Sequence, residues 1–233
     1  MDSGRRVFAG LIVVVLAIGG ATVGAGAQTE DGAAWCQARV DLEASFGFGD
    51  ESLIGPALEA FGGSAPAGIA DDSAFVAELL DRKGEKAFSN KKFSAAISRI
   101  DEYAVANCGY PVVDVTAMDY EYAGVPESIS AGTTAIYLTN GSPKEEHEIV
   151  VFRVKDGVTK AAPELFGLPE KKAQKVVQFV GGAEAAPGAS AASITNLEPG
   201  RYVYGCFLPL GGKKKGAPHF TKGMVGEFEV TAG

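Results

Sequence analysis

Metal-binding side chains are scarce in this chain of 233 residues, which contains two histidines, three cysteines and three methionines. Two histidines exclude a zinc site built on three imidazoles and any other chemistry that needs several of them. Basic residues are outnumbered too, with 21 Lys plus Arg against 29 Asp plus Glu and a net charge of −8. Because phosphate and anionic lipid attract basic surfaces, we expect no nucleic-acid partner and no strong binding to a membrane surface.

Familiar catalytic and repeat signatures are missing as well. The sequence has no G-x-S-x-G nucleophile elbow, no internal repeat and no heptad pattern. Hydrophobic residues make up 46% and charged residues 21%, which fits one or two globular domains. We expect a folded protein that is not an enzyme; a Ser-His-Asp hydrolase stays an alternative without a motif to support it.

The N-terminus has the order of a secretory signal peptide. Arg5 and Arg6 precede an apolar run centred on residues 11–18, and small residues follow up to Ala27. This pattern predicts a signal peptide over 1–27 and an extracytoplasmic mature protein, secreted, periplasmic or at the cell surface. The alternative is an uncleaved N-terminal anchor, because the uncharged run is just long enough to span a bilayer. The two arginines leave Sec and Tat export both open.

Residues 31–108 carry apolar stripes at helical spacing. The clearest stripe recurs at i, i+4, i+7 and i+10 and consists of Phe93, Ile97, Ile100 and Tyr103. Glycines and a proline separate it from weaker stripes before it. We expect a small helical domain over 28–109, with its acidic residues on solvated helix faces and no catalytic pattern.

The three cysteines allow three different single bridges. In an oxidising compartment we expect Cys36 and Cys108 to pair, because Cys36 opens the first predicted helix and Cys108 closes the last. Such a bridge would staple a small bundle by closing a long loop of the unfolded chain. Cys206 is then left as a free thiol that needs an explanation.

After residue 111 the apolar pattern changes to period two. Short β-rich runs alternate with turn signals such as Asn140-Gly141 and Asp156-Gly157, which indicates a β-sandwich over 112–233. Residues 160–192 lack the alternation and are expected to form a long crossover or flap. The predicted fold class is therefore α+β with two domains, a small helical bundle followed by an all-β Greek-key sandwich.

Four residues of metal-binding types fall at or near the ends of predicted strands in this second half. His147 starts one strand, Cys206 ends another, His219 lies in the following loop and Met224 opens the last strand. Taken alone, each of these residues would more often be a buried core residue or a solvated surface residue than a metal ligand. Together, two imidazoles, a thiolate and a thioether are the ligand set of a blue-copper electron-transfer site.

Residues 113–232 resemble the cupredoxins, the type 1 copper β-sandwiches. The segment 140–149 looks like the loop that delivers their first histidine ligand, and 197–206 looks like their penultimate strand ending in the cysteine ligand. The segment 218–224 keeps the His-x4-Met spacing of plastocyanin-like members. The resemblance implies a cupredoxin-like domain that binds one type 1 copper for electron transfer or copper handling, with a redox partner protein. Its implied copper ligands are His147, Cys206, His219 and Met224.

One departure from the cupredoxin pattern leaves more than one interpretation of the site. Twelve residues separate Cys206 from His219, where typical blue-copper proteins have only a few. The insertion could bulge out as a hairpin, or it could mark a relative that has lost the metal. One alternative is therefore a metal-free surface module that uses the scaffold for its shape. Another is a structural zinc site on His147, Cys206 and His219, although methionine is a poor fourth ligand for zinc.

Overall fold

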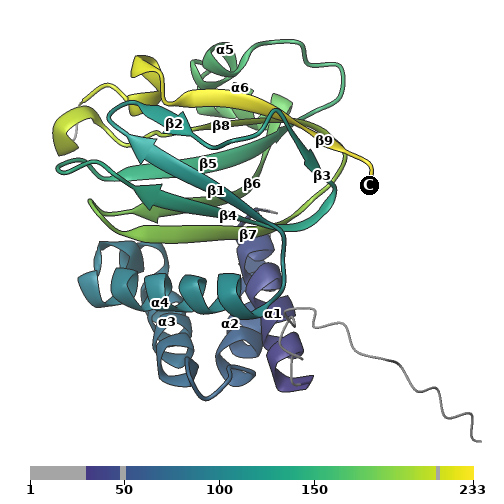
Figure 1. Cartoon of the computed structure of the whole chain (residues 1–233), viewed down its shortest axis with the longest axis vertical. Coiled ribbons are helices and arrows are strands. Elements are labelled where there is room, and N and C mark those ends of the chain that lie inside the picture. Colours follow the sequence, from purple (N-terminus) through teal and green to yellow (C-terminus); the bar gives the residue numbers. More distant parts are fainter. Residues whose placement is uncertain (1–29, 48–50, 214–215) are drawn as a thin grey trace, which may run out of the picture.

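The structure is a computed structural model that describes residues 30–47, 51–213 and 216–233. Helices occupy the first part of the chain and two β-sheets the second, with the helices packed beneath the sheets (Figure 1). This confirms the predicted fold class, a helical part followed by a β-sandwich. The predicted signal peptide lies outside the described residues. Among the residues that are described, no helix is long and apolar enough to cross a membrane.

Four α-helices form the N-terminal part: α1 (Glu30–Gly47), α2 (Ile54–Gly63), α3 (Ala70–Lys83) and α4 (Lys91–Asn107). Two short 3-10 segments, Glu51–Leu53 and Gly84–Ser89, connect them. Trp35 is fully buried at their centre, against the rings of Phe61 and Tyr103. Asn90 caps α4, because its side chain accepts the backbone N–H groups of Lys92 and Phe93.

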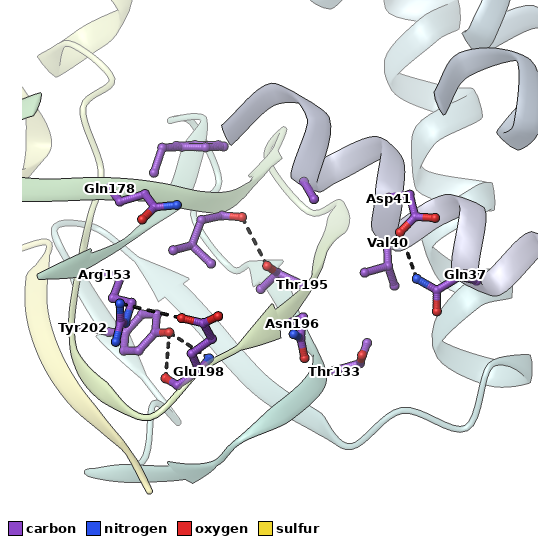
Figure 2. Close-up of a pocket in the computed structure, with 13 residues that line it drawn as sticks. Gln37, Val40, Asp41, Thr133, Arg153, Gln178, Thr195, Asn196, Glu198 and Tyr202 are labelled. Atoms are coloured by element: carbon purple, nitrogen blue, oxygen red, sulfur yellow. Dashed lines mark hydrogen bonds and ion pairs between the residues drawn. The ribbon is translucent and has the colours of Figure 1, made fainter. Parts of the chain in front are cut away.

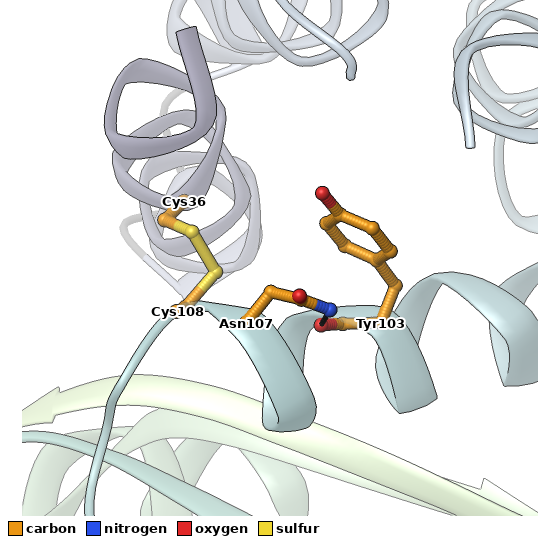
Figure 3. Close-up of a disulfide and its surroundings, with 4 residues drawn as sticks. All are labelled: Cys36, Tyr103, Asn107 and Cys108. Atoms are coloured by element: carbon orange, nitrogen blue, oxygen red, sulfur yellow. Dashed lines mark hydrogen bonds between the residues drawn. A yellow bond between two sulfur atoms is a disulfide. The ribbon is translucent and has the colours of Figure 1, made fainter. Parts of the chain in front are cut away.

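A disulfide ties the first helix to the end of the fourth. Cys36 in α1 is bonded to Cys108, the residue that caps the C-terminus of α4 (Figure 3). The predicted pairing is therefore present, and Cys206 remains a free, buried cysteine. Figure 3 also shows Asn107, whose side chain donates to the backbone carbonyl of Tyr103 at 2.8 Å in the last turn of α4.

The sandwich consists of a four-stranded and a five-stranded sheet. The first has the order β2-β1-β4-β7 and the second β3-β9-β8-β5-β6. Pairing is antiparallel except between β1 and β4 and between β3 and β9, which are parallel. The strand bounds are β1 Val112–Met118, β2 Glu121–Ala123, β3 Ser128–Ser130, β4 Gly132–Asn140, β5 His147–Val154, β6 Val177–Ala185, β7 Ser190–Leu197, β8 Gly200–Gly205 and β9 Val225–Thr231.

The four-stranded sheet lies between the helices and the five-stranded sheet, and strand β4 shows why it is apolar on both faces. Ile136 and Leu138 belong to the core between the two sheets, whereas Ala135 and Tyr137 pack in the core shared with the helices. Neighbouring residues of a strand point to opposite faces, so β4 contributes to two cores at once. The helical part therefore covers the outer face of the four-stranded sheet (Figure 1).

A buried polar cluster joins the helices to strand β7. Arg39 and Glu43 of α1 and Asp101 of α4 are all buried, and Arg39 pairs with Glu43 at 2.8 Å and with Asp101 at 3.1 Å. The two carboxylates also accept backbone N–H groups of β7, from Ile194 at 2.9 Å and from Ala192 at 2.8 Å. The expectation that the acidic residues of this half lie on solvated faces is wrong for Glu43 and Asp101.

The segment 160–192 has more regular structure than the sequence indicates. It contains two short helices, α5 (Ala162–Phe166) and α6 (Glu170–Val176), then β6 and the start of β7. Gly181 and Gly182 make β6 look like a loop in the sequence. A Cβ at Gly181 would overlap the Ser193 hydroxyl and the Glu43 carboxylate, so this glycine marks a close approach between strand and helix.

Candidate metal centre

Three predicted metal ligands lie together at one end of the sandwich. His147 is the first residue of β5, Cys206 directly follows β8, and His219 begins a 3-10 turn over His219–Lys222. The ligand atoms of the three side chains lie within 4.8 Å of one another. All three residues are buried, with exposures of 0%, 0% and 1%. The structure thus brings together side chains that are 72 and 13 positions apart in the chain.

The atoms that face one another are a consistent donor set. Nδ1 of His147 is 3.2 Å from Nδ1 of His219, and the latter is 3.3 Å from Sγ of Cys206. Two imidazole nitrogens bonded to one ion at about 2.0–2.1 Å, the length of a zinc–imidazole bond, lie about 3.2 Å apart when the angle between them is roughly 100°. The observed spacing fits a single ion with near-tetrahedral angles.

At most one hydrogen bond can join the two imidazoles of this group, because a single proton serves the contact between the two Nδ1 atoms. Nε2 of His147 is buried and has no hydrogen-bond partner among the described residues, whichever tautomer the ring adopts. A metal on Nδ1 would leave that Nε2 as it is. It would explain why the two Nδ1 atoms face each other.

The twelve-residue insertion forms a hairpin that returns His219 to Cys206. Pro209 and Pro218 form an isolated β-bridge, and the N–H of Leu210 donates to the carbonyl of Ala217 at 3.0 Å. The N–H of Phe220 then donates to the carbonyl of Cys206 at 2.8 Å. The predicted hairpin is therefore present in the structure. Residues 214 and 215, within this hairpin, lie outside the described residues.

Met224 is fully buried in the same core cluster as Cys206. Its backbone is tied to both neighbouring ligands, since its carbonyl accepts the N–H of Cys206 at 3.0 Å and its N–H donates to the carbonyl of His219 at 3.4 Å. Gly223 before it has φ of 120°, a conformation that favours glycine. These bonds place the backbone of Met224 beside Cys206 and His219.

Burial sets the protonation of the ligand side chains. It raises the pKa of the Cys206 thiol to about 12, because the thiolate would lose its hydration. Burial, followed by the neighbouring His219, lowers the pKa of His147 and keeps this imidazole neutral. A neutral imidazole is ready to bind a metal, whereas the thiol must release its proton when a metal binds.

Two acidic residues that were not predicted from the sequence lie close to the ligands. Oε2 of Glu145 lies 2.9 Å from Nε2 of His219, and Oε1 accepts the hydroxyl of Tyr120 at 2.9 Å. Glu148 accepts the N–H of Phe207, the residue after Cys206, at 2.7 Å. Burial raises the pKa of Glu148 to about 7. The position of Glu145 and Glu148 on either side of His147 in the sequence was the available signal.

A second cleft lies away from this centre. It has a volume of about 550 Å³ and opens between α1 and the sandwich (Figure 2). Its polar side chains are largely engaged with one another or with backbone. Gln37 donates to Asp41 at 2.8 Å, Tyr202 donates to the carbonyl of Glu198 at 2.8 Å, and Thr195 donates to that of Val180 at 3.2 Å. It contains none of the four predicted metal ligands.

Comparison with solved structures returns blue copper proteins over the second half of the chain. A dithionite-reduced auracyanin from the photosynthetic bacterium Roseiflexus castenholzii is 18% identical, with 52% of this chain and 96% of that chain covered and a TM-score of 0.34. Auracyanin A, a blue copper protein from Chloroflexus aurantiacus, is 16% identical over 53% and 100%, with a TM-score of 0.35. Reduced rusticyanin is 19% identical over 52% and 79%, with a TM-score of 0.31.

No protein-family model and no curated protein matches the sequence. The second half of the chain is a β-sandwich whose two mixed sheets enclose one core. The ligand atoms of His147, Cys206 and His219 lie close together, and Met224 belongs to the same core cluster as Cys206.

Proposed function

We propose that the sandwich binds one copper ion and serves as a one-electron carrier, and that the protein is not an enzyme. His147, Cys206 and His219 would hold the metal, with Met224 as a weaker fourth ligand. The observation that carries the proposal is the convergence of two imidazoles and one thiol in a buried place, with their ligand atoms within 4.8 Å of one another. Bound copper supplies a couple between its singly and doubly charged states, to which this donor set is suited.

The chain's own residues prepare this site in three ways. The strands and the hairpin hold the ligand side chains in place, so these side chains would move little when the charge of the bound copper changes. Burial excludes water from the ligand atoms. The thiol of Cys206 gives up its proton to solvent as metal binds, which makes binding favoured at higher pH.

The partner of such a carrier would be a second redox protein. We propose no nucleic-acid partner, because the net charge of −8 opposes binding to phosphate. We also propose that the protein works outside the cytoplasm. The disulfide between Cys36 and Cys108 supports that proposal, since such bonds persist in oxidising compartments.

The test is a titration of the purified protein with Cu(II), followed by its visible spectrum. We expect an intense band that saturates at one equivalent and is lost in Cys206→Ala. Val151→Ala is the matched control, because it truncates a buried side chain of β5 outside the ligand set and should keep the band.

Two outcomes would contradict a copper centre. If no band forms and unfolding exposes one reactive thiol, the domain is a metal-free module. If metal analysis finds tightly bound zinc that copper does not displace, the site is the zinc site considered above.

A further inference from the structure

The outer edge of the His219 ring is covered by a carboxylate. Nε2 of His219 lies 2.9 Å from Oε2 of Glu145, and His219 is only 1% exposed. The two atoms are at hydrogen-bond distance, although the N–H of the ring does not point straight at the carboxylate oxygen.

Glu145 is held in this place from several sides. Its carboxylate accepts the Tyr120 hydroxyl at 2.9 Å and the N–H of Gly211 at 3.2 Å. Its backbone N–H donates to Ser142 Oγ at 3.1 Å, and its carbonyl accepts the side chain of Asn140 at 2.8 Å. Two contacts fix the carboxylate and two fix the backbone, so the side chain is pre-positioned for His219.

Tyr120, which holds Glu145, has an unusual backbone. Its φ is 72°, and no other residue of the described part of the chain except glycine has positive φ. A bulky residue adopts this conformation only where its surroundings enforce it, and such strain collects at functional sites. The ring of Tyr120 also meets that of His219 edge-on, with centroids 5.2 Å apart. Tyr120 and Glu145 together enclose the imidazole.

A metal at Nδ1 of His219 leaves the ring proton on Nε2, the nitrogen that faces Glu145. A carboxylate in this position fixes the tautomer and the ring orientation and makes the imidazole a stronger donor. Its negative charge also favours the more highly charged state of the metal. We propose that Glu145 is a positioning residue that locks His219 and lowers the reduction potential of the bound copper. This role rests on the proposed function.

Glu145→Gln tests the role, because glutamine has nearly the same shape and keeps an acceptor but loses the charge. Glu146→Gln is the matched control, since Glu146 is the next residue, is exposed, and changes the net charge equally. The first measurement is the Cys206-dependent band in the wild type and both variants. The second is the reduction potential of each by redox titration.

We expect a higher potential in Glu145→Gln than in Glu146→Gln, with Glu146→Gln close to the wild type. Glu145→Asp keeps the charge and should lie nearer to the wild type than Glu145→Gln does. In the reduced protein, the Nε2 proton of His219 should exchange slowly with water in the wild type and quickly in Glu145→Ala, as observed by NMR.

The two proposals fail in different ways. A wild type without the band overturns the copper function and this role with it. A wild type with the band, but with equal potentials and equal proton exchange in the Glu145 and Glu146 variants, overturns the role of Glu145 alone.

Discussion

Asp101 in α4 accepts a 2.8 Å hydrogen bond from the backbone N–H of Ala192 in β7, across the boundary between helices and sandwich. Strand β7 is the last strand of its sheet, so one of its edges has no neighbouring strand. An exposed edge of this kind invites pairing with other chains. Here side chains of α1 and α4 take the place of a further strand, and Arg39 balances part of their charge.

Asp101→Ala should destabilise the protein by about 3 kcal/mol, because it leaves a buried N–H without an acceptor and removes a partner of Arg39. Asp72→Ala is the control, since Asp72 also pairs with an arginine of α4, Arg99, but that arginine is exposed. We expect the control to cost at most about 1 kcal/mol. Urea unfolding measures both, and equal losses would contradict a special role for the buried pair.

The pH dependence of stability should carry the signature of Asp101. Burial raises its pKa to about 6 against the opposing effect of Arg39, while Glu43 adds to the rise. A carboxyl with a raised pKa in the folded state stabilises the fold fully below its unfolded pKa of about 3.9. That contribution is lost as the pH rises through about 6. The loss amounts to about 3 kcal/mol for a shift of roughly two units.

Asp101→Asn cannot titrate, so its unfolding free energy should fall less than that of the wild type between pH 4 and pH 7. Urea unfolding at pH 4, 5, 6 and 7 measures the difference between the two proteins. A difference that does not change with pH would show that Asp101 does not titrate in this window.

Removal of the disulfide should cost about 4 kcal/mol, as expected for a bridge that closes a loop of some 72 residues. The double variant Cys36→Ala/Cys108→Ala tests this by urea unfolding without reductant. Its copper band should remain, because the ligands lie in the sandwich. Cys206→Ala is the complementary control, which keeps the bridge and loses the band. In the wild type, unfolding without reductant should expose one thiol; three thiols would contradict the bridge.

Gly205→Ala should disturb the metal centre through packing. A Cβ at this position would lie 2.6 Å from the ring of Phe166 in α5 and 3.2 Å from the carbonyl of Met224. Overpacking of this kind costs about 1–3 kcal/mol, and here it acts next to Cys206. Gly182→Ala is the control, since its Cβ would meet only ordinary contacts of 3.5 Å or more.

We expect a shifted copper band and a lower melting temperature for Gly205→Ala, with partial recovery when Phe166→Ala is added. Recovery would identify the Phe166 ring as the obstacle. An unaltered spectrum in Gly205→Ala would mean that the strand end relaxes without moving the ligand.

The two halves could be predicted because their apolar residues recur differently, at helical spacing in the first half and at every second position in the second half. The ligand types were found for a different reason, namely that the chain has so few of them. What could not be predicted arises from contacts between distant segments. Gly181 looks like a loop residue until Glu43 packs against it, and the strand β6 is hidden as a result.

The buried acids could have been recognised in part. Asp101 follows Phe93 and Ile97 at intervals of four, so it lies on the apolar stripe of α4 and not on its polar face. Glu145 is a different case, because nothing in the sequence shows that Tyr120 and Gly211, distant in the chain, hold its carboxylate.

The hairpin between Pro209 and Pro218 shows that two ligands can be close in space although many residues lie between them in the sequence. Twelve residues separate Cys206 from His219, yet Sγ and Nδ1 are 3.3 Å apart. The two arms of the hairpin are joined by the bridge and by the hydrogen bond from Leu210 to Ala217, so residues added at the tip would not move Cys206 or His219. The entropy of closing such a loop grows only slowly with its length. The length of this loop can therefore change without separating the two side chains. A sequence pattern that requires a short Cys-to-His spacing would miss this chain and any relative with an equally long hairpin.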